Sequence, residues 1–356
     1  MPISAIDAIN PAFNHAKKQL FEPFRFSQWW RLGLVGMLAG EMGSGGGFHG
    51  NFNIPSTHRQ GGSEQFLASA WPKLFSDHPL IVAGLIAFMV VAGIGLIVLF
   101  TYVSSVMRFI LFDSIVTREC HIRQGWVRRR REGRMLFLWQ MALLVLSLVA
   151  MAILIGIPAS FAWGLGWFQH PHEHMLPLIL GGIVLVLEFL ALIVGFSVVH
   201  VMTKDFVVPQ MALENVTAFE GWNRLWRAVK AEKSGYALYI GMKIGLAIAA
   251  SMATAIISLI VILVLALAIG GVGVAIVMAA KTAGATWNVQ TITLAVAAAG
   301  IVLALLLFVL SLISVPVIVF FPAYSIYFLA ARYPTLAAVI WPPLPGSVTP
   351  VQSGLI

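Results

Sequence analysis

The sequence predicts an all-α integral membrane protein, a polytopic transmembrane helical bundle. Hydrophobic residues make up 60% of the 356 positions and charged residues only 10%, whereas soluble domains carry about 25% charged residues. Several uninterrupted apolar stretches exceed the roughly 20 residues that a helix needs to cross a bilayer. These stretches lack the alternation of barrel strands, and backbone groups in lipid must be bonded within the protein, so the sequence favours helices.

The apolar pattern predicts six transmembrane helices. The first is weaker than the others because it contains Glu41 and runs into a glycine-rich stretch at 43–47. The fifth is followed by a second glycine-rich stretch at 270–273, which predicts a break in the helix. The six predicted helices cover about residues 29–47, 79–107, 135–167, 175–203, 236–269 and 291–319.

The distribution of basic residues predicts the topology. Lysines and arginines are concentrated in the links that begin at Arg108 and Lys204. The links 168–174 and 281–290 together contain one basic residue, Lys281, if histidines are not counted. Because cytoplasmic loops carry an excess of basic residues, we expect both chain ends in the cytoplasm and the protein in the cell (inner) membrane. The predicted parts are a cytoplasmic interfacial segment over 1–28, a single transmembrane bundle over 29–332 with a flexible outer loop over 48–78, and a cytoplasmic tail over 333–356.

The two basic links resemble each other, which predicts an internal repeat. A shift of 96 residues places Arg108 on Lys204, and it places a Gly-Trp-x-Arg pattern at 125–128 on the same pattern at 221–224. A third, partial copy follows the last helix at 319–322, so the six helices are expected to form three hairpins. The alternative is that similar membrane interfaces acquired tryptophan and arginine independently.

Both basic links are predicted to hold helices that lie in the membrane interface, because tryptophan and basic residues recur on successive helical turns. Each Lys or Arg near an anionic leaflet contributes about 1 kcal/mol of attraction. Anionic membrane lipids are therefore the expected partners, and the net charge of +8 does not indicate nucleic acid. The alternative is that these charges only set the topology. The candidate lipid-headgroup residues are Arg128, Arg129, Arg130, Arg131, Arg224, Arg227 and Lys230.

Two charged residues lie inside predicted helices. Glu188 is near the middle of the fourth helix, where a carboxylate costs at least a few kcal/mol, so we expect it to face the bundle interior. Lys243 lies seven residues into the fifth helix, from where its ammonium group can reach the inner boundary. Glu188 is interpreted either as a proton- or cation-binding carboxylate on a transport pathway or as a hydrogen-bonded packing residue. An ion pair between Glu188 and Lys243 is a further hypothesis.

The outer link between the third and fourth helices contains His170, His172 and His174 beside Glu173, residue types that bind zinc, copper or nickel. A polar turn is the favoured interpretation because one short link offers no second ligand set, so neither a metal nor another cofactor is predicted. The sequence contains no zinc-hydrolase, serine-hydrolase, Walker or dinucleotide-binding motif. No catalytic residue is therefore predicted, and the sequence favours a non-enzymatic protein.

Residues 205–224, together with Phe-Ser-Gln-Trp-Trp-Arg-Leu at 26–32 and the glycine-rich break that follows it, carry a family resemblance. Over most of its length the chain resembles a group of uncharacterised bacterial and archaeal multi-pass membrane proteins. It is also loosely similar to the membrane domain found in some glycerophosphodiester phosphodiesterases, although it contains no phosphodiesterase domain. The resemblance implies the architecture and supplies no activity and no site residues.

The expected function is to bind or organise a lipid or a small ligand within the helical bundle. One alternative is a proton- or cation-coupled transporter that uses Glu188. A second alternative is a lipid-modifying membrane enzyme, which would require an accessible polar cluster at one membrane interface.

Overall fold

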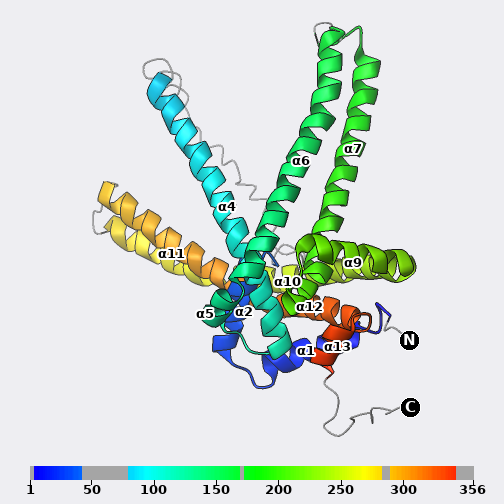
Figure 1. Ribbon diagram of the computed structural model, residues 1–356. Coiled ribbons are helices and arrows are strands. Elements are labelled where there is room, and N and C mark those ends of the chain that lie inside the picture. The colour runs from blue at the N-terminus through cyan, green and yellow to red at the C-terminus, as the bar shows by residue number, and fades with distance from the viewer. Residues whose placement is uncertain (1–3, 42–78, 169–171, 283–288, 342–356) are drawn as a thin grey trace, which may run out of the picture.

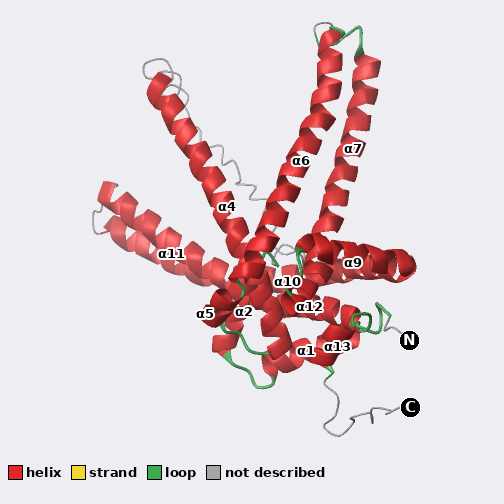
Figure 2. Ribbon diagram, viewed as in Figure 1, coloured by secondary structure: helices red, strands yellow, loops and turns green. Residues whose placement is uncertain are grey.

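The computed structural model describes residues 4–41, 79–168, 172–282 and 289–341, which form helices and no strand (Figures 1 and 2). Three arms extend from one base in Figure 1. They are α4 (Pro79–Thr117), the hairpin of α6 (Arg130–Gly164) and α7 (Met175–Met202), and the hairpin of α10 (Lys233–Thr282) and α11 (Val289–Ile313). The base also contains α1 (Ile9–Phe21), α2 (Phe26–Leu38), α5 (Ile122–Arg128), η1 (Thr203–Val207), α8 (Val208–Glu214), α9 (Ala218–Ala231), α12 (Val315–Ala330) and α13 (Pro334–Ile340).

The arms have the length and composition of membrane helices. Within the described residues, five helical stretches are long and apolar enough to cross a membrane, and in four of them the most apolar window has no buried residue. A water-soluble protein would bury such surfaces, whereas a bilayer covers them. The five stretches are Leu80–Thr117, Arg130–Gly164, Met175–Glu214, Lys233–Gly271 and Val296–Ala330. The chain therefore has the helices of a multi-pass membrane protein.

The predicted span at 29–47 is wrong for the residues that the structure describes. α2 has 13 residues, which rise about 20 Å, less than the roughly 30 Å of hydrocarbon. It lies in the base because its glycines allow a close approach of α12. A Cβ atom on Gly33 would lie 3.1 Å from Val315, and one on Gly36 would overlap Ile318. Positions 42–47 of the predicted span lie outside the described residues, as does the predicted outer loop at 48–78 up to Pro79.

Two other predicted helix boundaries are also wrong. α10 continues through residues 270–273 to Thr282, because a glycine costs a helix only about 1 kcal/mol and backbone groups in lipid must keep their helical bonds. The last predicted helix, in contrast, is divided. α11 ends at Ile313 and α12 begins at Val315, since Pro316 has no backbone N–H with which to continue the helical hydrogen bonds.

The hydrophobic core lies in the base. Phe206, Tyr236, Tyr239, Tyr324 and Phe328 are buried, and the centroids of their neighbouring rings are 4.6–6.0 Å apart. Aromatic pairs of this kind contribute about 0.5–1.5 kcal/mol each beyond the area that they bury. These side chains come from η1, α10 and α12, so the core fixes the near end of the α10 arm to the end of α7.

Both described ends of the chain lie in the base, on the side opposite the arm tips (Figure 1). α1 packs along α12, and the Tyr324 hydroxyl donates to the Ala5 carbonyl at 3.0 Å. The chain passes from the base at Glu41 to the far tip of α4 at Pro79 through residues that lie outside those described. The two ends are thus on one side of the molecule.

His15 of α1 makes a pH-sensitive contact in the base. Its Nε2 lies 3.0 Å from the Ile115 carbonyl oxygen, and its Nδ1 lies 3.2 Å from the Tyr327 hydroxyl oxygen. Burial, and then the guanidinium of Arg118, lower the pKa of His15 below its ordinary value of 6.5. The folded protein therefore favours the neutral imidazole.

We expect the stability of the protein to fall in mild acid. The unfolded chain takes up the His15 proton at about pH 6.5, before the folded protein does, so this contribution to stability is present above about pH 6.5 and is lost as the pH falls towards the lowered pKa. The Tm in detergent should therefore decrease between about pH 7.5 and 5.5, and it should decrease less in His15→Gln. An equal decrease in His15→Gln would assign the pH dependence to other groups.

Candidate functional site

A buried polar cluster lies where the arms meet the base, and the end of α2 forms one side of it. α2 ends in a Schellman motif, in which the Glu41 N–H donates to the Gly36 carbonyl at 2.9 Å and the Gly40 N–H donates to the Met37 carbonyl at 3.1 Å. Gly40 has a φ of +79°, a left-handed conformation that glycine adopts without strain. This turn directs the Glu41 side chain and the Ala39 carbonyl into the protein.

The π-helical segment η1 forms the other side. In a regular α-helix, Pro209 would clash with the carbonyl of Asp205, four residues earlier, and the wider turn of η1 relieves this clash. Thr203, at the start of η1, accepts a hydrogen bond from the Trp222 indole N–H at 2.9 Å. Through this local geometry, Lys204 and Asp205, which are neighbours in sequence, both reach the cluster.

Two ion pairs join three elements in the cluster. The ammonium group of Lys204 donates to the carboxylate of Glu41, and that of Lys243 donates to Asp205. The Tyr239 hydroxyl donates to the same Asp205 oxygen at 2.9 Å. Asp205 is only 2% exposed, and a charge buried to this extent is stable only when it is paired and hydrogen-bonded. The pairs therefore fix the relative positions of α2, η1 and α10.

Arg108 of α4 is the third cation of the cluster, and its hydrogen bonds go to neutral acceptors. Nε donates to the Ala39 carbonyl at 3.1 Å, and Nη2 lies 2.9 Å from Nε2 of His200. Because a guanidinium can only donate, Nε2 of His200 is the acceptor and this imidazole is neutral. Arg108 is 7% exposed, and its Nη1 has no hydrogen-bond acceptor among the described residues.

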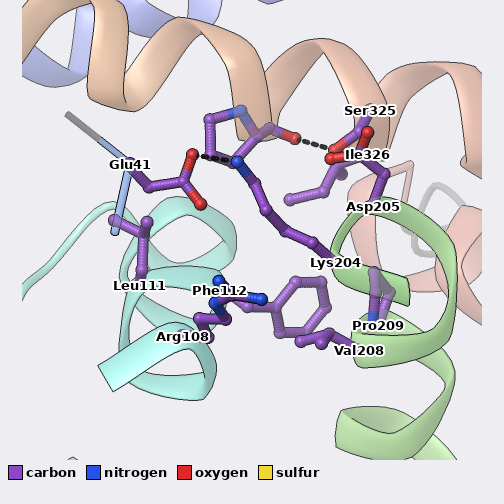
Figure 3. Close-up of a pocket in the computed structure, with 11 residues that line it drawn as sticks. Glu41, Arg108, Leu111, Phe112, Lys204, Asp205, Val208, Pro209, Ser325 and Ile326 are labelled. Atoms are coloured by element: carbon purple, nitrogen blue, oxygen red, sulfur yellow. Dashed lines mark hydrogen bonds and ion pairs between the residues drawn. The ribbon is translucent and has the colours of Figure 1, made fainter. Parts of the chain in front are cut away.

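Two cavities adjoin the cluster. The small cavity, of about 30 Å³, lies among Glu41, Arg108, Lys204 and Asp205 (Figure 3). A larger crevice, of about 550 Å³, lies between α4, α6 and α7 and also reaches Lys204 and His200. The crevice is lined by the apolar side chains Met141, Leu143, Leu144, Phe196 and Val201 and by the polar side chains Thr101, Gln140, Ser147 and Ser197. It thus has largely apolar walls and ends at the ammonium group of Lys204, which is paired with Glu41, and at the neutral imidazole of His200.

A family model for a family of unknown function, DUF7544, matches residues 3–339 of the chain. The chain belongs to this family. Comparison with curated proteins and with solved structures gave no match. The predicted resemblance to uncharacterised membrane proteins is confirmed at this level, and the family description assigns no activity to its members.

In this DUF7544 protein, the structure separates the two predicted intramembrane residues. Lys243 is buried, and its partner is Asp205. Glu188 is exposed on α7, 16 residues and roughly 24 Å along the helix from Lys204. The expectation that Glu188 faces the interior is therefore wrong for a single chain, and its hypothesised pair with Lys243 does not form. Transport through Glu188 stays a prediction, which a pH-dependent flux lost in Glu188→Gln would test.

The predicted lipid-headgroup residues divide into two groups. Arg129 is buried and forms a bidentate ion pair with Asp113, with Nε–Oδ2 and Nη2–Oδ1 distances of 2.7 and 2.6 Å. Arg224 is half-buried and pairs with Glu214 and Glu220. These two arginines are engaged within the base and do not offer their charges to lipid. The remaining five side chains are exposed: Arg128, Arg130, Arg131, Arg227 and Lys230.

The predicted histidine tract is only partly described. His170 lies outside the described residues, and His172 is exposed. His174 packs against Trp167, with their ring centroids 6.1 Å apart. Within the described parts of the chain, no group of three or more His, Cys, Asp or Glu side chains could hold a metal ion.

Sequence reasoning missed most of the cluster. Asp205 and His200 stand at the end of a strongly apolar run, and Glu41 stands in a glycine-rich one. A charged residue at the end of an apolar run is ordinarily a boundary residue, so nothing local distinguished these three. One signal was available, because Arg108 and Lys204 occupy equivalent positions in the predicted repeat and both line the small cavity.

Proposed function

We propose that this protein binds an anionic amphiphile, a lipid of the inner leaflet, in the crevice between α4, α6 and α7. The single observation that carries this function is the chemistry of the crevice, whose largely apolar walls end at Lys204 and His200. Apolar walls suit acyl chains, and the ammonium group of Lys204 suits an anionic headgroup.

The size and depth of the crevice support this proposal. Its volume of about 550 Å³ falls in the range of roughly 300–1,000 Å³ that is typical of ligand sites. Lys204 lies two residues beyond the end of α7, whose 28 residues rise about 42 Å, so the Lys204 end of the crevice lies at a membrane boundary. A headgroup of the adjacent leaflet lies at this depth.

The buried carboxylates favour binding over chemical turnover. Glu41 and Asp205, the acidic side chains of the cluster, are both held in ion pairs with lysines. A lipid-modifying enzyme needs an acid, base or nucleophile that can reach its substrate. The sequence predicts a loose similarity to the membrane domain of some glycerophosphodiester phosphodiesterases, which is a prediction compatible with a lipid ligand that brings no activity to this chain.

We also propose an orientation for the protein in the cell membrane, with the base on the cytoplasmic side. The exposed arginines of α5 and α6, including Arg128, Arg130 and Arg131, lie at the base, and cytoplasmic surfaces carry such an excess of basic residues. Arg227 and Lys230 of α9 extend this basic surface. We propose these exposed side chains as secondary contacts to anionic headgroups.

We also propose that the chain arose by internal duplication. Arg108 and Lys204 line the same cavity from equivalent repeat positions. The helical stretch that follows each of them is ended by a residue with positive φ, α4 by Arg118 at 60° and the continuous η1–α8 stretch by Asn215 at 55°. In each copy, the next short helix carries a Gly-Trp pair. A repeated turn geometry of this kind is unusual for non-glycine residues.

We expect native mass spectrometry of the gently extracted protein to show one tightly retained anionic phospholipid. Ser197→Trp places a large ring in the crevice and should remove most of this lipid, because the ring occupies the volume of an acyl chain. Ser160→Trp, on an exposed turn of α6 outside the crevice, is the matched control and should retain it. Equal lipid retention in both variants, or retention of zwitterionic lipid alone, would contradict the proposal.

A further inference from the structure

Arg108 carries a buried positive charge, and among the described residues no carboxylate accepts a hydrogen bond from its guanidinium group. Its acceptors are the Ala39 carbonyl and the neutral imidazole of His200. The two carboxylates of the cluster are each engaged by a lysine, Glu41 by Lys204 and Asp205 by Lys243. Among the described residues, three cations of the cluster therefore face two anions, which leaves an excess of one positive charge there.

A buried cation of this kind ordinarily has a counter-ion, because burying an uncompensated charge costs several kcal/mol. Arg108 also retains an unused donor, since its Nη1 is buried and has no acceptor among the described residues. The small cavity lies directly against this side chain and against Lys204 (Figure 3). Charge and hydrogen bonding thus both point to an anionic ligand in this cavity.

The size of the cavity limits the ligand. Its volume of about 30 Å³ exceeds the roughly 10–15 Å³ that one water molecule requires, so a single small ion fits. A phosphate group with its substituents does not fit, so the headgroup of a lipid in the crevice cannot fill this cavity. The ligand must therefore be small, monovalent and able to accept an N–H bond.

We propose that the small cavity is a binding site for a chloride ion, held by Nη1 of Arg108 and by the positive charge of Lys204. Chloride balances the excess positive charge and gives the free Nη1 donor an acceptor. The same site would take bromide, which has the same charge and a similar size. This site shares Lys204 with the proposed lipid crevice, but it does not require that crevice to be occupied.

The test is a halide titration of the full-length protein in detergent, with sodium gluconate replacing sodium chloride at constant ionic strength. We expect chloride and bromide to raise the Tm saturably, by about 2 °C or more, because a ligand that binds only the folded state stabilises it. Arg108→Gln keeps a donor and loses the charge, and it should abolish the halide effect. Arg134→Gln, an exposed arginine of α6, is the matched control and should keep it.

A direct measurement on the wild-type protein covers the case in which Arg108→Gln does not fold. Chloride-35 NMR should show line broadening by the protein that bromide reverses by competition. A Tm that is independent of halide, together with an unbroadened chloride line, would overturn the proposal and leave a water molecule as the occupant. Loss of lipid retention in Ser197→Trp with the halide effect intact would separate this site from the crevice.

Discussion

Asp205→Ala is expected to destabilise the protein by about 3–5 kcal/mol. The substitution removes the carboxylate that accepts hydrogen bonds from Lys243 and Tyr239, and it leaves the ammonium group of Lys243, 6% exposed, without its counter-ion. Equilibrium unfolding in mixed micelles, followed by tryptophan fluorescence, would measure the loss.

The double variant Asp205→Leu/Lys243→Met distinguishes a broken pair from lost packing. If the cost of Asp205→Ala arises from the unpaired ammonium group of Lys243, removing both charges should recover part of the stability. The reason is that replacing a buried ion pair by apolar residues of similar volume often leaves stability unchanged. Glu119→Ala, at an exposed position, serves as the control and should change stability by less than about 0.5 kcal/mol. Additive losses in the double variant would contradict a direct pair.

Arg129→Ala is expected to cost about 3 kcal/mol or more. Besides its bidentate pair with Asp113, Arg129 donates from Nη1 to the Ala212 carbonyl at 2.8 Å, so one side chain joins α4, the start of α6 and α8. Arg129→Lys should recover only part of the loss, because an ammonium group cannot make the two parallel bonds of a guanidinium. Thermal unfolding in detergent would rank the variants.

Arg130→Ala provides the matched control for Arg129. Arg130 is adjacent in sequence and exposed, so its removal should leave the Tm nearly unchanged while it weakens binding to anionic vesicles. Equal destabilisation by Arg129→Ala and Arg130→Ala would show that the Asp113 pair does not hold the base together. The comparison thus separates a structural arginine from a surface arginine within the four consecutive arginines at 128–131.

The sequence predicted the class and the arms of this protein. Length and apolar composition alone indicated α4, α6, α7 and α10 as membrane helices, because the choice between lipid and protein as surroundings depends on the average property of a whole segment. The same averaging produced the errors. Averaging over a segment predicted a span over 29–47, where close glycine packing holds a short helix in the base. It also did not distinguish the apolar residues of α12 as a helix separate from the last predicted span.

The candidate site shows the same division between local pattern and tertiary contact. The charge of Lys243 within an apolar helix was visible in the sequence, and so was the alignment of Arg108 with Lys204 in the predicted repeat. The partner of Lys243 was not visible, since Asp205 is 38 residues away and turns inward only through the π-helical segment before Pro209. Arg129 likewise could not be distinguished from Arg128, Arg130 and Arg131 in the sequence, because these arginines differ only in the residues that contact them in the folded protein.

The sequence by itself therefore determined that this chain is helical, that it belongs in a membrane and where its longest helices run. These properties follow from hydropathy and from the backbone's need for internal hydrogen bonds, which every residue of a segment shares. Only the tertiary structure decided which charges are buried, which carboxylate pairs with which cation and where the cavities lie. Those features depend on contacts between residues that are distant in sequence, and the free energy of a buried charge is set by its neighbours in space.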